Sequence, residues 1–284
     1  MIAFSLWPVH IYRYGIFYFI SFILGYLGFK YLAKKKYFAT SFPRIQNILD
    51  NHIENLLIFI LLGVLLWGRL GNDIIYYPQY FLQHPGQILS FWQGGMSFIG
   101  GIFGVTIAIF LFRKRQKGKK YDLRMLFDIL LLFLPIGIAL GRVGNYLNQE
   151  LYGVVVSDRL PRLGYPLFSL LHDINIFHVY PAVDSMLRVN TNFLAVFFEG
   201  IVTFVLGLFV MRSQIRKKIF HPGMWSAVFL LRYSFIRFIL EYFRADSQLE
   251  FHGPFTTSQR FFIGFFILGL LILYFSSRWW KKKS

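Results

Sequence analysis

The sequence predicts an all-α polytopic membrane protein of about seven transmembrane helices, with a small subdomain on the outer, periplasmic side of the membrane. Composition supports this prediction, because 56% of the 284 residues are hydrophobic and 20% are aromatic. Length supports it too, because apolar runs recur that can cross a hydrocarbon layer of roughly 30 Å. The third observation is charge, because basic residues gather between alternate apolar runs.

Each apolar run is expected to form one membrane span. The runs cover residues 14–32, 55–69, 94–112, 125–140, 193–211, 225–243 and 261–276. We therefore expect residues 1–284 to form a single integral membrane domain whose termini lie on opposite sides of the membrane. The first run lacks a small-residue cleavage site, so we interpret it as a membrane anchor and not as a removed signal peptide.

The net charge of +17 is unevenly distributed along the chain. Twenty of the thirty lysine and arginine residues fall in four clusters on one side of the seven-span arrangement, at residues 30–44, 113–124, 212–218 and 278–283. The positive-inside rule makes that side cytoplasmic, with the N-terminus outside and the C-terminus inside. Orientation and contact with anionic lipids account for these charges, so we expect a membrane and no nucleic acid as partner.

The segment between the fourth and fifth predicted spans, residues 141–192, is long enough to form an outer subdomain. It contains three prolines and has alternating apolar positions. These positions predict short strands around residues 154–156 and 176–180.

The same segment opens with the most polar run near any predicted span. Residues 141–154 read GRVGNYLNQELYGV, which places glycines, amides, one arginine and one glutamate between two apolar stretches. Residues 68–72 read GRLGN and repeat its beginning at the outer end of the second span, which indicates a duplicated helix hairpin. We expect the functional site to lie at residues 141–154.

The sixth predicted span carries a polar stripe. Tyr233, Arg237, Glu241 and Arg244 follow one another at spacings of four, four and three, which places them on one face of a helix. One interpretation is that Glu241 neutralises an arginine and the set locks helices together. The alternative is that two arginines exceed one glutamate and leave a guanidinium for an anion such as a phospholipid phosphate.

Other residues are candidates for packing or for ligand contact. Residues 92–101 read WQGGMSFIGG, and Gly100 with Gly104 has the small-xxx-small spacing of closely packed helices. A backbone that approaches a ligand is the alternative reading. Glu199 lies early in the fifth span and must pair with an arginine or be protonated. The chain has no cysteine, which excludes disulfides, thiolate metal sites and a cysteine nucleophile.

Residues 141–153 resemble the signature of the prolipoprotein diacylglyceryl transferase family, G-R-x-G-N-x-x-N-x-E-x-x-G. The matching positions are Gly141, Arg142, Gly144, Asn145, Asn148, Glu150 and Gly153. Further matches extend through most of the chain, at Tyr14-Gly15, Gly94 to Phe98, Glu199-Gly200, Tyr233, Arg237-Phe238, Glu241 to Arg244 and Gln259.

The resemblance implies transfer of a diacylglyceryl group from phosphatidylglycerol to the lipobox cysteine of prolipoproteins in the bacterial inner membrane. The product is a thioether and the leaving group is glycerol phosphate, without cofactor or metal. By this resemblance Arg142 and Arg237 hold the phosphate, Tyr14 and Tyr233 hydrogen-bond the substrate, and Glu241 holds the arginines. Substrate-binding positions would be Asn145, Asn148, Glu150, Gly153, Arg244, Gly94, Gly95 and Ser97.

The chain departs from the family pattern where a base for the thiol would lie. Ile99 stands in place of the family histidine in the glycine-rich segment, residues 189–195 lack the family's histidine, proline and glutamate, and Val154 replaces an arginine. Another outer histidine can serve as base, and the candidates are His10, His84, His172, His178 and His252. Alternatively an arginine-rich site lowers the pKa of the thiol enough for water or phosphate to accept the proton.

Two rival functions follow from the same observations. A paralogue that binds phospholipid without catalysis, or that serves a different acceptor, is consistent with Ile99. A transporter is consistent with seven spans and an internal repeat, although it would need charged residues along a path open to both sides. We favour the active transferase, because Arg142, Arg237 and Glu241 are costly inside a membrane and are all retained.

Overall fold

A computed structural model describes residues 2–6, 9–76, 78–83, 86, 97–116, 122–156, 165–246, 251–252 and 254–281. The chain forms two compact units, one of Met1–Gly28 with Asp122–Ser284 and one of Phe29–Tyr121. Helix α1 (Arg13–Lys35) begins in the first unit and ends in the second.

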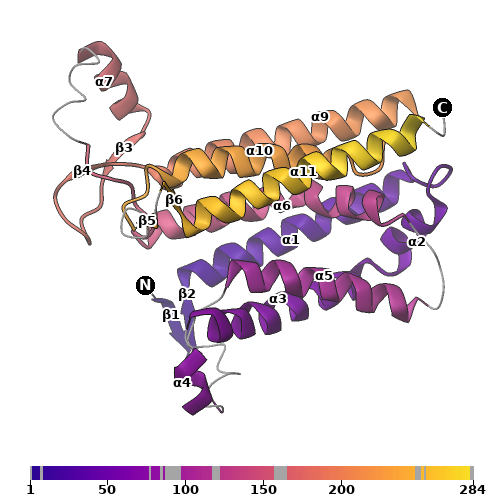
Figure 1. The fold of residues 1–284 in the computed structure, drawn as a ribbon, viewed down its shortest axis with the longest axis horizontal. Helices are drawn as coiled ribbons and strands as arrows, with labels where there is room; N and C mark the ends of the chain where they lie inside the picture. Colours follow the sequence, from indigo (N-terminus) through magenta and orange to yellow (C-terminus); the bar gives the residue numbers. More distant parts are fainter. Residues whose placement is uncertain are drawn as a thin grey trace. The chain divides into compact units, whose positions relative to one another are not determined.

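The first unit is a helical bundle, in which the long helices α6, α9, α10 and α11 run alongside one another in Figure 1. Its members are α6 (Leu123–Leu147), α8 (Thr191–Ala195), η4 (Val196–Ile201), α9 (Val202–Lys217), α10 (Met224–Glu241) and α11 (Thr257–Lys281). The elements α8, η4 and α9 follow without a break, and η4 is a π-helical turn within them. Helix α10 packs against α11, α6 and α9, so the stripe predicted on residues 233–244 lies within the bundle.

A buried aspartate fixes where α10 begins. Asp128 on α6 accepts hydrogen bonds from the backbone N–H groups of Gly223 (2.8 Å) and Ser226 (2.7 Å), and from the hydroxyl of Ser226 (2.5 Å). These donors include N–H groups of the first turn of the helix, which lack partners within the helix itself. The contact sets the register of α10 against α6, the two helices that carry Arg237 and Arg142.

The second unit contains α2 (Pro43–Asn51), α3 (Ile53–Tyr76), α4 (Pro78–Gln83) and α5 (Phe98–Arg115). Helices α3 and α5 pack closely through glycines. A side chain at Gly100 or Gly104 would clash with the carbonyl oxygens of Trp67 and Gly63 respectively. The close helix approach predicted from the spacing of Gly100 and Gly104 is therefore confirmed.

The long apolar helices identify the chain as an all-α membrane protein. Five helical segments are long and apolar enough to cross a bilayer: Gly15–Lys35, Ile53–Ile74, Leu123–Leu147, Thr191–Lys217 and Thr257–Arg278. The remaining two predicted spans coincide with α5 and α10, which are helical but shorter. Large apolar side chains such as Phe19, Leu62 and Phe209 are exposed on these helices, as expected for surfaces that face lipid.

Short strands lie at the ends of the helices. They form three antiparallel pairs: β1 (Ile2–Leu6) with β2 (Val9–Tyr12), β3 (Phe177–Val179) with β4 (Leu187–Val189), and β5 (Phe251–His252) with β6 (Phe255–Thr256). The strand predicted around residues 176–180 is confirmed by β3, and Val155 forms an isolated bridge with Arg188.

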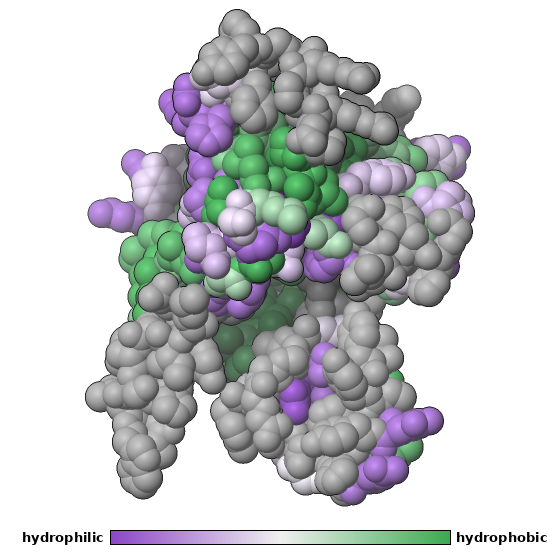
Figure 2. Space-filling model, turned by 90° about the vertical axis from the view of Figure 1, so that its left-hand side faces the viewer, coloured by the Kyte–Doolittle hydropathy of each residue, from purple (hydrophilic) through white to green (hydrophobic). Residues whose placement is uncertain are grey.

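The segment that holds β3 and β4 extends from one end of the first unit, together with α7 (Tyr165–Asp173) (Figure 1). Figure 2 faces this end of the molecule and shows hydrophilic side chains beside an apolar patch on the described surface. Such a mixed surface is what a boundary between lipid and water requires.

Candidate active site

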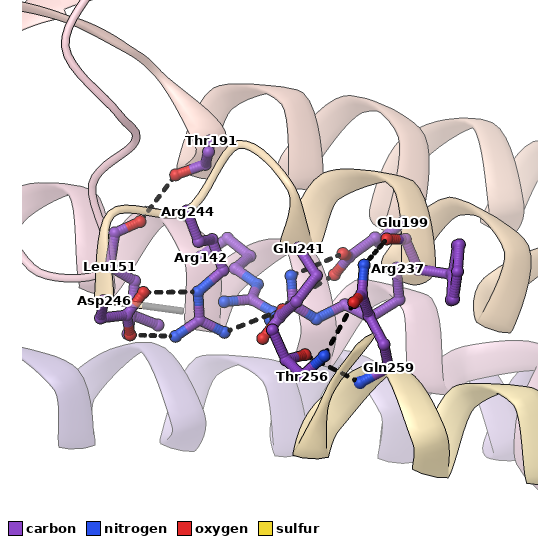
Figure 3. A network of polar contacts seen from close by, with 11 residues as sticks. Arg142, Leu151, Thr191, Glu199, Arg237, Glu241, Arg244, Asp246, Thr256 and Gln259 are labelled. Carbon is purple, nitrogen blue, oxygen red and sulfur yellow. Dashed lines mark hydrogen bonds and ion pairs between the residues drawn. The ribbon is translucent and has the colours of Figure 1, made fainter. Parts of the chain in front are cut away.

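Two arginines from different helices share one buried glutamate. Nη2 of Arg142 on α6 lies 3.4 Å from Oε2 of Glu199 on η4, and Nη1 of Arg237 on α10 lies 3.8 Å from Oε1 of the same carboxylate. Arg237 also pairs with Glu241, one turn further along α10, at 2.8 Å. Figure 3 shows these side chains converging from three elements. Tertiary packing thus joins the arginine of the 141–154 run to the stripe on α10.

The ion pairs continue toward the end of α10. Nη1 of Arg244 lies 3.5 Å from Oε2 of Glu241, and its Nε donates to Oδ1 of Asp246 at 3.0 Å (Figure 3). Positive and negative groups therefore alternate. We term this set the charge chain, and its members in order are Arg142, Glu199, Arg237, Glu241, Arg244 and Asp246.

The charge chain adds to one expectation. Two arginines exceed one glutamate on the stripe of α10, but among the described residues the charge chain as a whole has three arginines facing three carboxylates. An anion could still bind through hydrogen bonds. A guanidinium group carries five N–H donors in a planar fork, which is more than a single carboxylate accepts. The carboxylates keep these forks oriented toward one another across the helices.

Burial makes the pairing necessary. The side chains of Glu199, Glu241 and Arg237 are 0%, 1% and 7% exposed. A buried charge without a partner costs several kcal/mol, whereas a paired and hydrogen-bonded one is tolerated. Of the two alternatives predicted for Glu199, pairing with an arginine or protonation, the structure supports the first, with two arginines within 4 Å of its carboxylate. Sequence reasoning noticed this carboxylate inside a span but did not place it in the site.

Aromatic and amide groups surround Arg237. Its guanidinium lies 5.8 Å from the centroid of the Phe262 ring, and the ring of Tyr233 packs edge-on against the same phenylalanine. Tyr233, predicted to contact substrate, lies in this apolar cluster one turn before Arg237. Gln259 on α11 is buried and donates to the backbone carbonyl of Phe238 at 3.2 Å, which ties α11 to α10 beside the site.

The 141–154 run forms the end of α6 and a tight turn after it. Nδ2 of Asn145 lies 3.4 Å from Oε2 of Glu150. Gln149 and Leu151 have positive φ angles of 57° and 52°, a strained conformation for residues with a side chain. The hydroxyl of Thr191 holds the turn by donating to the carbonyl of Leu151 at 2.6 Å.

Gly153 explains how the end of this run acts on Arg244. Its backbone forms a bridge with that of Arg244, and its N–H donates to the carbonyl of Val189 at 3.0 Å. A Cβ atom at this position would clash with the Val189 carbonyl and lie 2.8 Å from the carbonyl oxygen of Phe243. Only glycine lets the two backbones meet, so the motif glycine positions an arginine that lies far away in sequence.

Arg188 supports the same backbone from the other side. It donates to the carbonyl of Gly153 at 3.1 Å and to Asp184 at 2.5 Å. The hydrogen bond from its guanidinium holds the pKa of Asp184 below the ordinary value. Arg188 thereby anchors β4 to the end of the 141–154 run.

The structure unites some of the predicted site residues and leaves others apart. Arg142, Arg237, Glu241 and Arg244 meet in the charge chain, and Asn145, Glu150 and Gly153 lie in the adjoining turn. Asn148 ends α6, and its buried Oδ1 has no hydrogen-bond partner among the described residues.

The remaining predicted site residues are not tested. Gly94, Gly95 and the side chain of Tyr14 lie outside the described residues. Ser97 belongs to the second unit, where its hydroxyl accepts from Gly100 N–H at 3.2 Å and so caps α5. The substrate-binding role of these four residues stays a prediction.

One outer histidine has a partner on α6. Nε2 of His178 lies 3.1 Å from the hydroxyl of Tyr146, which follows Arg142 by one helical turn. Partial burial lowers the pKa of His178 below its usual value, which favours the neutral imidazole. His172 is exposed on α7, and the side chains of His10, His84 and His252 lie outside the described residues.

The chain resembles known proteins over nearly its whole length. A family model described as prolipoprotein diacylglyceryl transferase matches residues 1–275. A protein of Legionella pneumophila is 33% identical over 99% of this chain and 96% of its own length. Relatives from Aromatoleum aromaticum (33% identical, 86% of this chain and 81% of theirs) and Rickettsia bellii (30%, 96% and 93%) are similar. All three are named phosphatidylglycerol–prolipoprotein diacylglyceryl transferase.

Proposed function

Because the chain belongs to the prolipoprotein diacylglyceryl transferase family, we propose that its charge chain is the site at which phosphatidylglycerol reacts. The chain is a transferase of membrane lipid, as its relatives are by name. The diacylglyceryl group passes from phosphatidylglycerol to the thiol of a prolipoprotein, a thioether forms, and glycerol phosphate leaves. Recognition of the acceptor through its lipobox cysteine is part of the proposal.

The observation that carries the site assignment is the sharing of Glu199 by Arg142 and Arg237. Two guanidinium groups held near one carboxylate can turn their other N–H donors to a phosphate diester, which accepts bidentate hydrogen bonds. Attack of sulfur on the glycerol carbon breaks the carbon–oxygen bond, and charge develops on the phosphate oxygen that leaves. Arginines preoriented toward that oxygen stabilise the transition state.

Other predicted residues support this arrangement in our proposal. Arg244 and Glu241 continue the charge chain, and Asn145 and Glu150 orient the headgroup from the adjoining turn. Gly153 acts through the backbone by positioning Arg244. Tyr233 lies one turn before Arg237, and we propose that it hydrogen-bonds the substrate. For Tyr14, Asn148, Gly94, Gly95 and Ser97, substrate contact is proposed from the sequence resemblance alone.

We further propose that seven helices cross the inner membrane, with the N-terminus outside and the C-terminus in the cytoplasm. Residues 141–192 then form the outer subdomain of a single integral membrane domain. Support comes from the basic clusters, all on one side of this arrangement, and from helices at all seven predicted positions. The charge chain then lies near the outer surface, where a secreted prolipoprotein arrives.

The experiment uses purified protein, phosphatidylglycerol and a synthetic peptide with a lipobox cysteine. Formation of product is measured by the mass added to the cysteine. We expect Arg142→Ala and Arg237→Ala each to lower kcat/KM by roughly 100-fold or more, because each removes a charge-assisted contact to the phosphate. Arg216→Ala, at an exposed position of α9, is the matched control and should retain activity. Full activity in either site variant would contradict the assignment.

A further inference from the structure

Arg232 lies in the middle of the apolar helix α10, five residues before Arg237 and off the polar stripe. Its side chain is half-buried. It forms no ion pair with a carboxylate in the part of the chain that the structure describes. A charged group inside a membrane span is costly, so an arginine without a counterion at this depth is a candidate for a specific role.

Both contacts of Arg232 are with the segment that runs from η4 into α9. Its Nη1 donates to the backbone carbonyl of Phe198 at 2.7 Å and to the hydroxyl of Thr203. That hydroxyl, on a residue that is 0% exposed, donates in turn to the same carbonyl at 2.8 Å. Two side chains therefore hold one carbonyl oxygen, and they tie α10 to the neighbouring helical segment at this point.

The carbonyl of Phe198 belongs to the π-helical turn. At the end of this turn the backbone N–H of Val202 donates to the carbonyl of Phe197, whereas an α-helix would direct it to the carbonyl of Phe198. The π-helical pattern takes this donor away from Phe198. The side chains of Thr203 and Arg232 supply donors in its place.

The same carbonyl is part of the peptide unit that leads into Glu199. Because a peptide unit is planar and rigid, fixing its oxygen restricts the backbone of Glu199. On the other side of Glu199, a Cβ atom at Gly200 would lie 2.5 Å from the Cβ of Ala139 on α6. The backbone around Glu199 is thus held from α10 and from α6, while its carboxylate pairs with the two arginines of the charge chain.

We propose that Arg232 is a positioning residue for the transfer reaction. By holding the carbonyl of Phe198 it fixes the backbone at Glu199, and the carboxylate of Glu199 orients Arg142 and Arg237. The proposal rests on the proposed function, in which these two arginines bind the phosphate of phosphatidylglycerol. Arg232 contacts no reacting atom in this arrangement, and its effect passes through Glu199.

The geometry of the π-helical turn indicates what loss of Arg232 would change. Such a turn accommodates one residue more than an α-helical turn, and one residue spans about 100° in an α-helix. A turn that is less firmly held can relax by part of this rotation and carry the carboxylate of Glu199 away from one arginine. Misplacement of a positioning group by about 1 Å can lower a rate by roughly 100-fold. Because Thr203 still holds the carbonyl, we expect a smaller loss.

The first experiment measures kcat and KM of Arg232→Met with phosphatidylglycerol and a lipobox peptide. We expect kcat per folded molecule to fall roughly tenfold while KM for the lipid stays within about twofold, because both phosphate-binding arginines are present but misaligned in the transition state. Arg232→Lys keeps a cationic donor for the carbonyl and should recover most of the lost kcat. Arg212→Met, at an exposed position of α9, is the matched control and should keep kcat unchanged.

A purely structural role of Arg232 predicts a different result, in which stability falls but kcat per folded molecule is unchanged. That result would overturn the proposal. A higher KM at unchanged kcat would also overturn it, because Arg232 would then contribute to ground-state binding of the lipid.

The second experiment tests whether Arg232 acts through Glu199. The substitution Arg232→Met is introduced into Glu199→Gln, in which the shared carboxylate charge is already lost. Residues that act through one another have non-additive effects, so we expect a further loss of kcat of less than about twofold in the double variant. A further loss of roughly tenfold would show that Arg232 acts independently of Glu199, and would contradict the proposal.

A third variant keeps the proposal testable if Arg232→Met does not fold or if Glu199→Gln has no measurable activity. Thr203→Val removes a donor to the Phe198 carbonyl without changing any charge, and should lower kcat by roughly threefold at unchanged KM. Thr106→Val is the matched control, since this exposed hydroxyl donates to the carbonyl of Ile102 at 2.9 Å. Equal kcat in the two threonine variants would overturn the positioning role.

The outcomes also separate this proposal from the one on which it rests. Absence of transfer by the unmodified protein would overturn the proposed transferase function. Transfer by the unmodified protein, with kcat unchanged in Arg232→Met and in Thr203→Val, would leave the transferase function intact and remove only the role of Arg232.

Discussion

At the residue scale, Glu199 is the member of the charge chain that two helices depend on. It is buried and forms ion pairs with Arg142 on α6 and with Arg237 on α10. Glu199→Gln keeps the shape and removes the charge, so both guanidinium groups lose their shared counterion. We expect the free energy of unfolding to fall by about 3–5 kcal/mol, the usual cost of leaving a buried charge without its partner. Thermal unfolding in detergent measures this.

The control for Glu199 is a glutamate whose ion pair faces solvent. Glu54 pairs with Lys30 at 2.5 Å, but its side chain is 46% exposed. Glu54→Gln should change stability by about 1 kcal/mol or less. Equal effects of the two substitutions would mean that Glu199 contributes no more than a surface charge, which would remove it from the site.

His178 gives the molecule a predictable response to acid. Partial burial lowers its pKa in the folded protein, while the unfolded chain keeps the ordinary value of 6.5. As the pH falls below 6.5, the unfolded state therefore binds the proton first, and folded stability declines until the pH has passed the lowered pKa. Between pH 7.5 and 5 we expect His178→Gln to lose less thermal stability than the unmodified protein.

Two comparisons sharpen the test of His178. His172→Gln, at an exposed site on α7, should leave the pH dependence of unfolding unchanged. The activity of His178→Gln addresses the missing family histidine: if His178 accepts the thiol proton through Tyr146, kcat falls while KM for lipid is kept. Retained kcat would favour the alternative in which the arginines lower the pKa of the thiol itself.

Some residues of the charge chain could be predicted from the sequence and others could not. Arg142, Arg237 and Glu241 could be predicted because charge inside an apolar run is costly and helical spacing places it on one face. Asp246 could not, because it follows the helix and acquires its role only through Arg244. The hydrogen bonds of Asn190 and Asn192 could not be predicted either, since they depend on contacts with Tyr180 and Glu150.

At the element scale, the α3–α5 contact depends on which face of α5 carries glycine. A Cβ at Gly100 would clash with the Trp67 carbonyl, whereas a Cβ at Gly101 would meet only a methyl group of Val64 at 4.0 Å. We expect Gly100→Ala to destabilise the protein by about 1–3 kcal/mol through overpacking. Gly101→Ala, one residue away on the same helix, is the matched control and should be neutral or slightly stabilising. Thermal unfolding of the two variants measures the difference, and equal stability would contradict the close contact.

The helices could be predicted from the sequence because each follows from a local apolar run, whereas contacts between distant segments could not. Helices occur at all seven predicted spans, because a long apolar run can satisfy its backbone in a membrane only as a helix. The π-helical turn at Val196–Ile201, which carries Glu199, has no signal in the local periodicity and was not predictable. The pairing of Gly153 with Arg244 joins residues far apart in sequence and has no local signal.

At the scale of the whole molecule, the distribution of charge predicts both the orientation in the membrane and the side on which the site lies. The thirteen lysines all lie on the proposed cytoplasmic side, and the arginines of the charge chain lie at the opposite end of the proposed spans. Lysine near a membrane sets orientation, whereas arginine with its planar fork suits phosphate. One chain thus uses its two basic residues for different purposes, and both uses require the proposed orientation to be correct.

That orientation can be tested directly because the chain has no cysteine. The helical segment Thr191–Lys217 has 27 residues, about 40 Å at 1.5 Å per residue, which is enough to cross the hydrocarbon layer. Asp173→Cys precedes this segment and Lys217→Cys ends it, and both positions are exposed. We expect a membrane-impermeant maleimide to label Asp173→Cys in intact spheroplasts and Lys217→Cys only after permeabilisation. The unmodified chain gives the blank, and labelling of both variants from one side would show that this segment does not cross the membrane.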